Sequence, residues 1–227
     1  MRIHRLVVSP WQANCYFVQP DDASPEVAVV DPGVQGAEAI EAQLEEIQLT
    51  PVALLGTHGH VDHVGDAHLL AARHEVPLHL AAEDRPLLTR PGLALGPNAS
   101  KFLPRMLGGT DELPAPQEVI DLREEQEIGG LRVRVLATPG HTKGSVVLDV
   151  AAGEQHVLFS GDVVFAGSIG RTDFPGGSMD EMRASLRRIL DTFDHELLVL
   201  PGHGQETSLA AEVSGNPYLS DDFLKVE

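Results

Sequence analysis

The segment at residues 57–63, Thr-His-Gly-His-Val-Asp-His, places four potential metal ligands in one short loop. It directly follows an apolar run, PVALL, that is typical of a buried strand. Alternate side chains of an extended segment point the same way, so His58 and His60 share a side. A turn into a following helix then brings Asp62 and His63 back toward them. Imidazole and carboxylate suit zinc, manganese or iron, so the fold must present a metal-binding loop at a strand end.

Three further candidate ligands stand where an apolar strand ends in a glycine-containing turn. They are His141 in ATPGHT, Asp162 in FSGD and His203 in LPGHG, and such turns line one edge of a sheet. Seven side chains are too many for one tetrahedral ion, but they suit two ions that share a carboxylate and keep room for water. The remaining histidines show no ligand spacing and are interpreted as surface or hydrogen-bonded core residues: His4, His68, His74, His79, His156 and His195.

The rest of the chain alternates strand-like and helix-like segments, which predicts an α/β fold. Helices are expected over residues 37–47, 66–74 and 179–190. Residues 85–117 contain six prolines that interrupt any long helix, so this stretch is expected to be irregular. It forms either a pocket wall, a subunit contact or a plain surface loop. Strands are expected at IHRLVV, NCYFVQ, EVAVVDPG, EVIDL, LRVRVLAT, SVVLDVA, QHVLFSGD and LLVLPGHG. No linker divides the chain, which predicts a single domain over residues 1–227.

Acidic side chains dominate the charge balance, with 34 Asp and Glu against 16 Lys and Arg and a formal net charge of −18. This charge repels a phosphate backbone, which argues against nucleic-acid partners. It also repels small anions, so bound metals or a few placed bases must supply any anion recognition. No apolar run approaches the ~18 residues of a membrane span, and the N-terminus has no signal-peptide pattern, so no membrane partner is expected. The single cysteine, Cys15, fits a reducing compartment, and we expect a cytoplasmic protein.

These motifs resemble those of the metallo-β-lactamase fold. THGHVDH is similar to the HxHxDH signature of that family, and PGHT, SGD and PGHG are similar to its later ligand motifs, in the same order. The resemblance implies a four-layer αβ/βα sandwich with two divalent metals, zinc or alternatively iron or manganese, at the shared edge of two sheets. It assigns His58, His60 and His141 to the first metal, Asp62, His63 and His203 to the second, and Asp162 as the bridge.

Within the family, NCYFV, VVDPG, GRTDFPGG and NPYL are most similar to the short bacterial relatives of glyoxalase II, the hydroxyacylglutathione hydrolases. This similarity implies a metallo-hydrolase for a glutathione-linked small molecule, such as the thioester S-D-lactoylglutathione. It implies attack by a metal-bound hydroxide that Asp62 orients. The chain ends soon after NPYLSDD, without the helical extension that helps to bind glutathione in longer members, so the motifs define the metals better than the substrate. They indicate no oligomeric state.

Two basic residues are candidate substrate contacts. Arg171, in GSIGRTDF, resembles in position a basic residue that holds the glycine carboxylate of glutathione, and a guanidinium can hold a carboxylate bidentately. The alternative is that Arg171 only ties its loop to Asp173. Lys143 stands where the relatives commonly have proline, and it is either an exposed surface lysine or part of the pocket rim.

Other functions remain as alternatives at this point. A persulfide dioxygenase of the same family shares the histidine motif and a GRTDF-like stretch but uses one iron, which would bind here to His58, His141 and Asp162. Lactonase or β-lactamase activity is compatible with the same scaffold. A non-catalytic binding protein that keeps a metal for stability is the alternative of a different class, and the complete ligand set argues against it.

Overall fold

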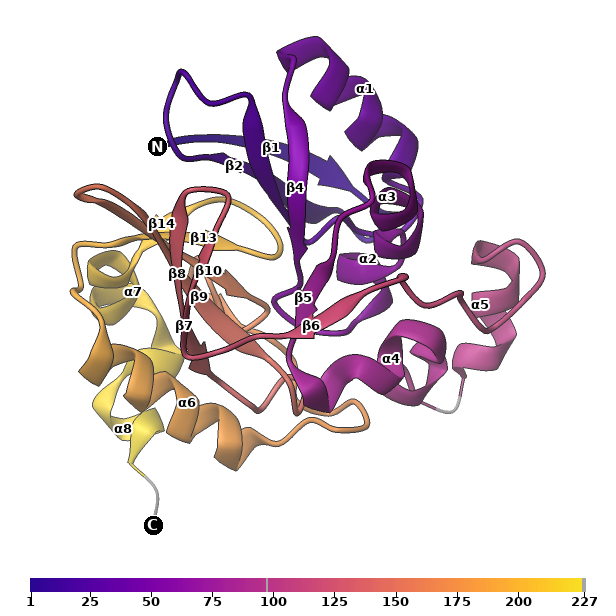
Figure 1. Ribbon diagram of the computed structural model, residues 1–227. Coiled ribbons are helices and arrows are strands. Elements are labelled where there is room, and N and C mark those ends of the chain that lie inside the picture. Colours follow the sequence, from indigo (N-terminus) through magenta and orange to yellow (C-terminus); the bar gives the residue numbers. More distant parts are fainter. Residues whose placement is uncertain (97, 226–227) are drawn as a thin grey trace.

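Two six-stranded β-sheets form the centre of the structure, a computed structural model that describes residues 1–96 and 98–225 (Figure 1). In the first sheet the strands follow one another in chain order from β1 to β6. The first three strands pair antiparallel, and β3 to β6 pair parallel. The strands are β1 (Arg2–Val8), β2 (Ala13–Gln19), β3 (Glu26–Val30), β4 (Thr50–Leu55), β5 (Leu78–Leu80) and β6 (Val119–Asp121).

The second sheet has the order β14-β13-β10-β9-β8-β7, in which only β10 and β13 pair parallel. Its strands are β7 (Glu125–Ile128), β8 (Leu131–Ala137), β9 (Val146–Ala152), β10 (Gln155–Gly161), β13 (Leu198–Pro201) and β14 (Thr207–Ser208). A separate two-stranded ribbon joins β11 (Val164–Phe165) and β12 (Ser168–Ile169). Strand β7 was not predicted from the sequence, because its segment EQEI carries three polar residues and pairs only at the sheet edge.

Helices cover the outer face of each sheet, with α1 and α3 on the first and α6, α7 and α8 on the second (Figure 1). The helices expected over 37–47, 66–74 and 179–190 are confirmed, and the last continues to Thr192. None of the helices in the described part of the chain has the length and apolar character of a membrane span. The α-helices are α1 (Ala37–Ile47), α2 (Val61–Val64), α3 (Ala67–His74), α4 (Arg85–Thr89), α5 (Ala99–Met106), α6 (Met179–Thr192), α7 (Leu209–Gly215) and α8 (Asp221–Leu224).

Three apolar cores separate four layers, which confirms the predicted αβ/βα sandwich. On β4, Leu54 packs toward α1 and α3, whereas its neighbour Leu55 packs between the sheets with Phe159. On β10, Leu158 faces the opposite way, toward the helices of the second half. Successive strand residues point to opposite faces, so sheets covered on both faces need strands that are apolar throughout. This is why β4 and β10 appear in the sequence as continuous apolar runs.

The proline-rich stretch at residues 85–117 contains short helices as far as Met106, and residues 107–117 form no helix or strand, as expected of an irregular segment. It contains α4, the 3₁₀ helix η2 (Pro91–Ala94) and α5, and prolines stand in the first turn of both α4 and η2. Pro97 lies outside the described residues. Leu103 of α5 is fully buried in a cluster with Val61 of α2. The stretch is therefore packed against the helix that follows the metal-ligand loop, and it is not a plain surface loop.

Candidate metal centre

The seven predicted ligands come together because four turns meet at one end of the sheets. Residues 57–63 follow β4, His141 lies in the turn between β8 and β9, and Asp162 and His203 directly follow β10 and β13. They form three overlapping groups, and within each group the ligand atoms lie within 4.8 Å of one another. The groups are His58, His60 and His141; His58, His63 and Asp162; and Asp62, His63 and His203.

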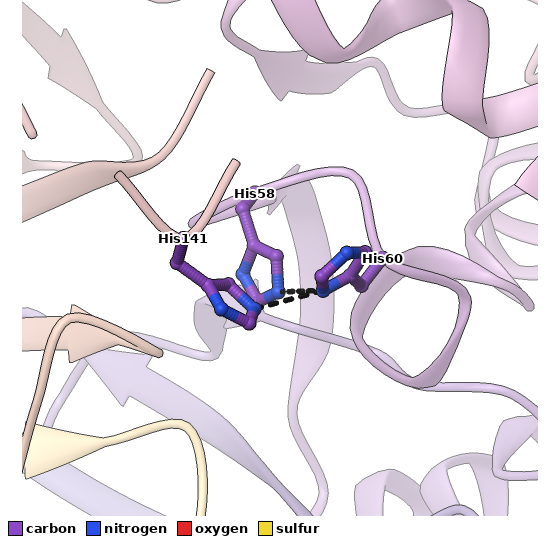
Figure 2. Close-up of side chains that lie close together, drawn as sticks. All are labelled: His58, His60 and His141. Atoms are coloured by element: carbon purple, nitrogen blue, oxygen red, sulfur yellow. Dashed lines mark hydrogen bonds between the residues drawn. The ribbon is translucent and has the colours of Figure 1, made fainter. Parts of the chain in front are cut away.

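Three buried imidazoles form the first group, and Figure 2 shows their rings directed toward one another. Nδ1 of His60 lies 3.1 Å from Nε2 of His58 and 2.8 Å from Nε2 of His141 (Figure 2). Three nitrogens that share so small a space cannot all carry protons, so lone pairs must face the common point. A soft or borderline cation at that point fits this donor set.

Asp62, His63 and His203, called the second group below, combine two imidazoles with a carboxylate. Nε2 of His63 lies 3.1 Å from Nε2 of His203, and Oδ2 of Asp62 lies 3.6 Å from the former and 3.3 Å from the latter. His63 is fully buried, whereas Asp62 and His203 are partly exposed. The second group therefore faces the protein surface more openly than the first.

Asp162 lies between the two groups, and its carboxylate faces ligand atoms of both. Its Oδ1 is 3.4 Å from Nε2 of His63, and its Oδ2 is 3.4 Å from Nε2 of His141 and 3.6 Å from Nε2 of His203. Oδ1 is buried and has no hydrogen-bond partner within the described residues. Buried carboxylate oxygens are normally satisfied, so this position fits a carboxylate that bridges two cations.

Hydrogen bonds to the Nδ1 atoms of three histidines fix the orientation and the tautomer of their rings. Nδ1 of His63 donates to Oδ2 of Asp31 at 3.0 Å, and Nδ1 of His141 donates to the carbonyl of Arg171 at 2.7 Å. Nδ1 of His58 donates to the hydroxyl of Thr57 at 3.1 Å, and that hydroxyl donates to Asp31 at 2.7 Å. With the proton on Nδ1, each ring turns the lone pair of Nε2 into the cluster.

Asp84 ties the two histidine-bearing loops together. It is 1% exposed and stands at the end of the 3₁₀ helix η1 (Ala82–Asp84). Its carboxylate accepts the backbone N–H of Gly59 at 2.7 Å and that of Gly144 at 2.9 Å, and it accepts the hydroxyl of Thr142 at 2.7 Å. Gly59 separates His58 from His60, and Thr142 follows His141. One buried carboxylate therefore sets the distance between the loops that carry the first group.

Electrostatics act differently on His58 and His60 than on His63. Burial lowers the pKa of His60 to about 3, and burial together with neighbouring imidazoles holds the pKa of His58 well below its usual value. Burial also acts to lower the pKa of His63, but the carboxylates of Asp162, Asp62 and Asp31 outweigh it and raise that pKa to about 10. His58 and His60 are thus ready to bind a cation at neutral pH, whereas His63 must first release a proton.

A pocket of about 290 Å³ opens over the ligand atoms. Its apolar wall comes from Trp11, Leu95, Phe102 and Phe174, and the Trp11 and Phe102 rings meet edge to face with centroids 6.3 Å apart. Leu95 and Phe102 belong to the stretch at 85–117, so that stretch forms a pocket wall, one of the three roles considered for it.

Arg171 lines the pocket, but its guanidinium is already engaged. It donates from Nε and Nη2 to the two carboxylate oxygens of Asp173, each at 2.8 Å, and it stacks over the Phe174 ring at 3.6 Å from the centroid. The structure therefore shows the brace to Asp173. Lys143 is exposed beside His141 and does not contribute to the pocket lining.

Several residues that shape the site carried no signal of that role in the sequence. Asp31 is visible there only as the start of an Asp-Pro-Gly turn, although its positive φ of 52° directs the carboxylate to Thr57 and His63. Asp84 follows Glu83 in the segment AAEDRP, which has no ligand spacing. Trp11 and Phe102 are far apart in the chain and become neighbours only through tertiary packing.

Comparison with known proteins agrees with this geometry. Residues 8–203 match the family described as Metallo-beta-lactamase superfamily. The chain is 36% identical to the probable metallo-hydrolase YqgX of Bacillus subtilis, over 97% of this chain and 98% of the relative. It is 33% identical to the hydroxyacylglutathione hydrolase GloC of Haemophilus influenzae, over 97% and 99% of the two chains.

Solved structures give the same result. BLEG-1, a B3 metallo-beta-lactamase, superimposes with a TM-score of 0.82 at 32% identity and covers 96% of this chain and 100% of its own. TTHA1623 in a di-iron-bound form has a TM-score of 0.77 at 33% identity, over 95% and 100% of the two chains. ETHE1 from Myxococcus xanthus has a TM-score of 0.75 at 25% identity, over 99% and 88%.

Proposed function

Because this chain belongs to the metallo-β-lactamase superfamily and is a metal-dependent hydrolase, we propose that it cleaves a thioester of glutathione, such as S-D-lactoylglutathione. The observation that carries the proposal is the complete ligand cluster under an open pocket with an aromatic wall. The similarity to GloC over nearly the whole of both chains supports the thioester as the substrate class.

The same proposal assigns the ligands. His58, His60 and His141 would hold one ion, Asp62, His63 and His203 would hold a second, and Asp162 would contribute to both. Zinc is the proposed metal, with iron or manganese as alternatives; TTHA1623 binds two irons. Divalent ions bound there supply an activated water at neutral pH and polarise the carbonyl of the substrate.

The chain's own residues orient and protect the reaction. Asp62 lines the pocket, and although burial acts to raise its pKa, the neighbouring His63 and His203 hold that pKa well below its usual range. It therefore stays a hydrogen-bond acceptor and can orient the attacking water. Trp11 and Phe102 form an apolar wall that limits the access of bulk water to the reacting carbonyl. A thiolate leaves readily near neutral pH, so the site needs no strong general acid.

The test is hydrolysis of S-D-lactoylglutathione by the purified protein before and after chelation. We expect turnover that chelation abolishes and added metal restores. Asp62→Asn should lower kcat strongly, whereas His156→Ala, a histidine of β10 outside the cluster, should leave it unchanged. Two equivalents of metal without turnover of any thioester would contradict the proposal and favour a binding protein.

Two other activities are tested in the same preparation. His58, His141 and Asp162 would hold the single iron of a persulfide dioxygenase, and oxygen consumption with glutathione persulfide would indicate that activity. BLEG-1 is a B3 metallo-beta-lactamase that is 32% identical to this chain, so a β-lactam and a lactone belong in the substrate panel. Hydrolysis of either in preference to the thioester would replace the proposed substrate class.

A further inference from the structure

The turn that carries His203 follows a strand of the second sheet, but residues of the first sheet hold it. The turn comes directly after β13, and its Gly202 N–H donates to the carbonyl of Gly161 in its own sheet at 2.8 Å. On the opposite side, His203 forms an isolated antiparallel bridge with Ala13 of β2. Nδ1 of His203 donates to the carbonyl of Gln12, at a distance of 3.2 Å. The position of this ligand therefore depends on contacts between the two halves of the sandwich.

Asn14 of β2 holds the turn on both sides of His203. Its side-chain nitrogen, Nδ2, donates to the carbonyl of Pro201 at 2.9 Å and to that of Gly204 at 3.0 Å. Its backbone N–H donates to the carbonyl of Gly202 at 2.7 Å, and the residue is 1% exposed. An amide N–H₂ group has two hydrogens, one for each of the two carbonyls that flank the ligand. One buried side chain thus fixes the backbone before and after His203.

His203 needs such support because packing restrains it less than its neighbours. Its side chain is 26% exposed, whereas those of His63 and His141 are 0% and 4% exposed. A buried ring is held in place by the atoms packed around it, but a partly exposed ring relies on hydrogen bonds and on the backbone that carries it. The hydrogen bonds from Asn14 therefore have a direct effect on where the His203 ring lies.

The carbonyls that Asn14 binds each have a second donor. The Tyr16 hydroxyl donates to the carbonyl of Pro201 at 2.7 Å, and Nη1 of Arg5 donates to that of Gly204 at 3.1 Å. Loss of the Asn14 amide therefore leaves neither carbonyl unpaired, and the fold should tolerate the change. What is lost is the single group that ties both ends of the turn to one point on β2.

We propose that Asn14 is a positioning residue for His203 and thereby for the metal ion of the second group. The inference rests on the ligand assignment made with the proposed function, and it extends the metal centre to a residue that is not a ligand. An outer residue that orients a metal ligand contributes to metal affinity without contacting the ion. Asp84 ties together the loops of the first group, so the two groups have separate supports. Loss of the Asn14 amide should therefore affect one metal ion and spare the other.

Titration of the metal-free protein with zinc, followed by calorimetry, tests the inference. The wild type should show two binding steps, and His203→Ala identifies the step that belongs to the second group. Asn14→Leu keeps the approximate volume of the side chain and removes both donors. It should weaken that step about 10–100-fold and leave the other step at its wild-type affinity. Asn14→Ala should behave in the same way, and Tyr16→Phe, which removes the other donor to Pro201, should weaken the same step by less.

Gln19→Leu is the matched control. Gln19 is also a buried amide of β2, but its Nε2 donates to the carbonyl of Ser24 at the far end of the strand, so both binding steps should keep their wild-type affinity. Wild-type affinity for both steps in Asn14→Leu, or equal weakening of both steps, would overturn the inference. A wild type with a single binding step would refute the ligand assignment and the inference with it. Two bound metals without thioester hydrolysis would refute only the proposed substrate, so the failures are distinguishable.

Discussion

Truncation of Asp84 should loosen the metal site without touching a ligand. The side chain is buried and accepts hydrogen bonds from the backbone N–H groups of Gly59 and Gly144 and from the hydroxyl of Thr142. The Thr142 hydroxyl has a second partner in Ser145 at 2.7 Å, so it can stay satisfied after the change. The two N–H groups have no such substitute, and Asp84→Ala leaves both buried and unpaired.

The magnitude follows from those two groups. An unsatisfied buried donor costs about 1–3 kcal/mol, so Asp84→Ala should lower the free energy of unfolding by about 2–6 kcal/mol. Asp84→Asn keeps one acceptor oxygen but turns an amide N–H₂ toward a donor, and we expect a loss of about 1–3 kcal/mol. Domains have a total stability of about 5–15 kcal/mol, so the upper end of this loss would bring a domain of low stability to the limit of folding.

Urea unfolding of the metal-free proteins measures this loss, and metal titration of the asparagine variant measures its effect on the first group. We expect weaker metal binding in Asp84→Asn, because the His58–His60 loop and the His141 loop are no longer held at a fixed distance. Asp149→Asn is the control: Asp149 is also buried, but its contact is a partly exposed histidine, His156, at 3.2 Å. Equal stability of Asp84→Ala and the wild type, within about 0.5 kcal/mol, would refute this reasoning.

Three further predictions concern the same region. Gly144→Ala should destabilise the protein and weaken metal binding, because the new Cβ would lie 2.6 Å from Cγ of Asp84; thermal unfolding with and without metal measures both effects. Metal affinity should rise with pH by about tenfold per unit below pH 10, because a proton held on His63 with a pKa of about 10 competes with the metal. Titration calorimetry in buffers of different ionisation enthalpy should detect the released proton. A pH-independent affinity would contradict the assignment. Phe102→Ala should lower kcat/KM for thioesters with bulky apolar acyl groups more than for S-D-lactoylglutathione, because it removes one side of the Trp11–Phe102 wall. A uniform loss of kcat/KM across a series of acyl groups would contradict a role of Phe102 in contacting the acyl group.

The layered fold could be predicted from the sequence because its signals are local. The apolar strands that run into PGHT, SGD and PGHG appear as strands followed by turns whatever the rest of the chain does, and each turn carries one ligand. The loop at 57–63 is more informative still, since four potential ligand residues stand within seven positions. Strand β7 has no such signal, because a polar edge strand is defined by its partner β8 and not by its own composition.

The parts of the site that could not be predicted depend on distant contacts. Asp84 reaches Gly59 across 25 residues and Gly144 across 60, and no spacing rule connects them. Whether the Arg171 guanidinium is paired depends on the side-chain conformation of Asp173, which the sequence does not determine.

Metal stoichiometry tests the central claim most directly. The account predicts about two equivalents of divalent metal per chain in the wild type, measured by inductively coupled plasma mass spectrometry after equilibration with zinc. Asp162→Ala should retain about one equivalent or fewer, because the bridging carboxylate contacts both groups. A wild type that binds no metal, or an Asp162→Ala variant that keeps two equivalents with unchanged affinity, would contradict the account.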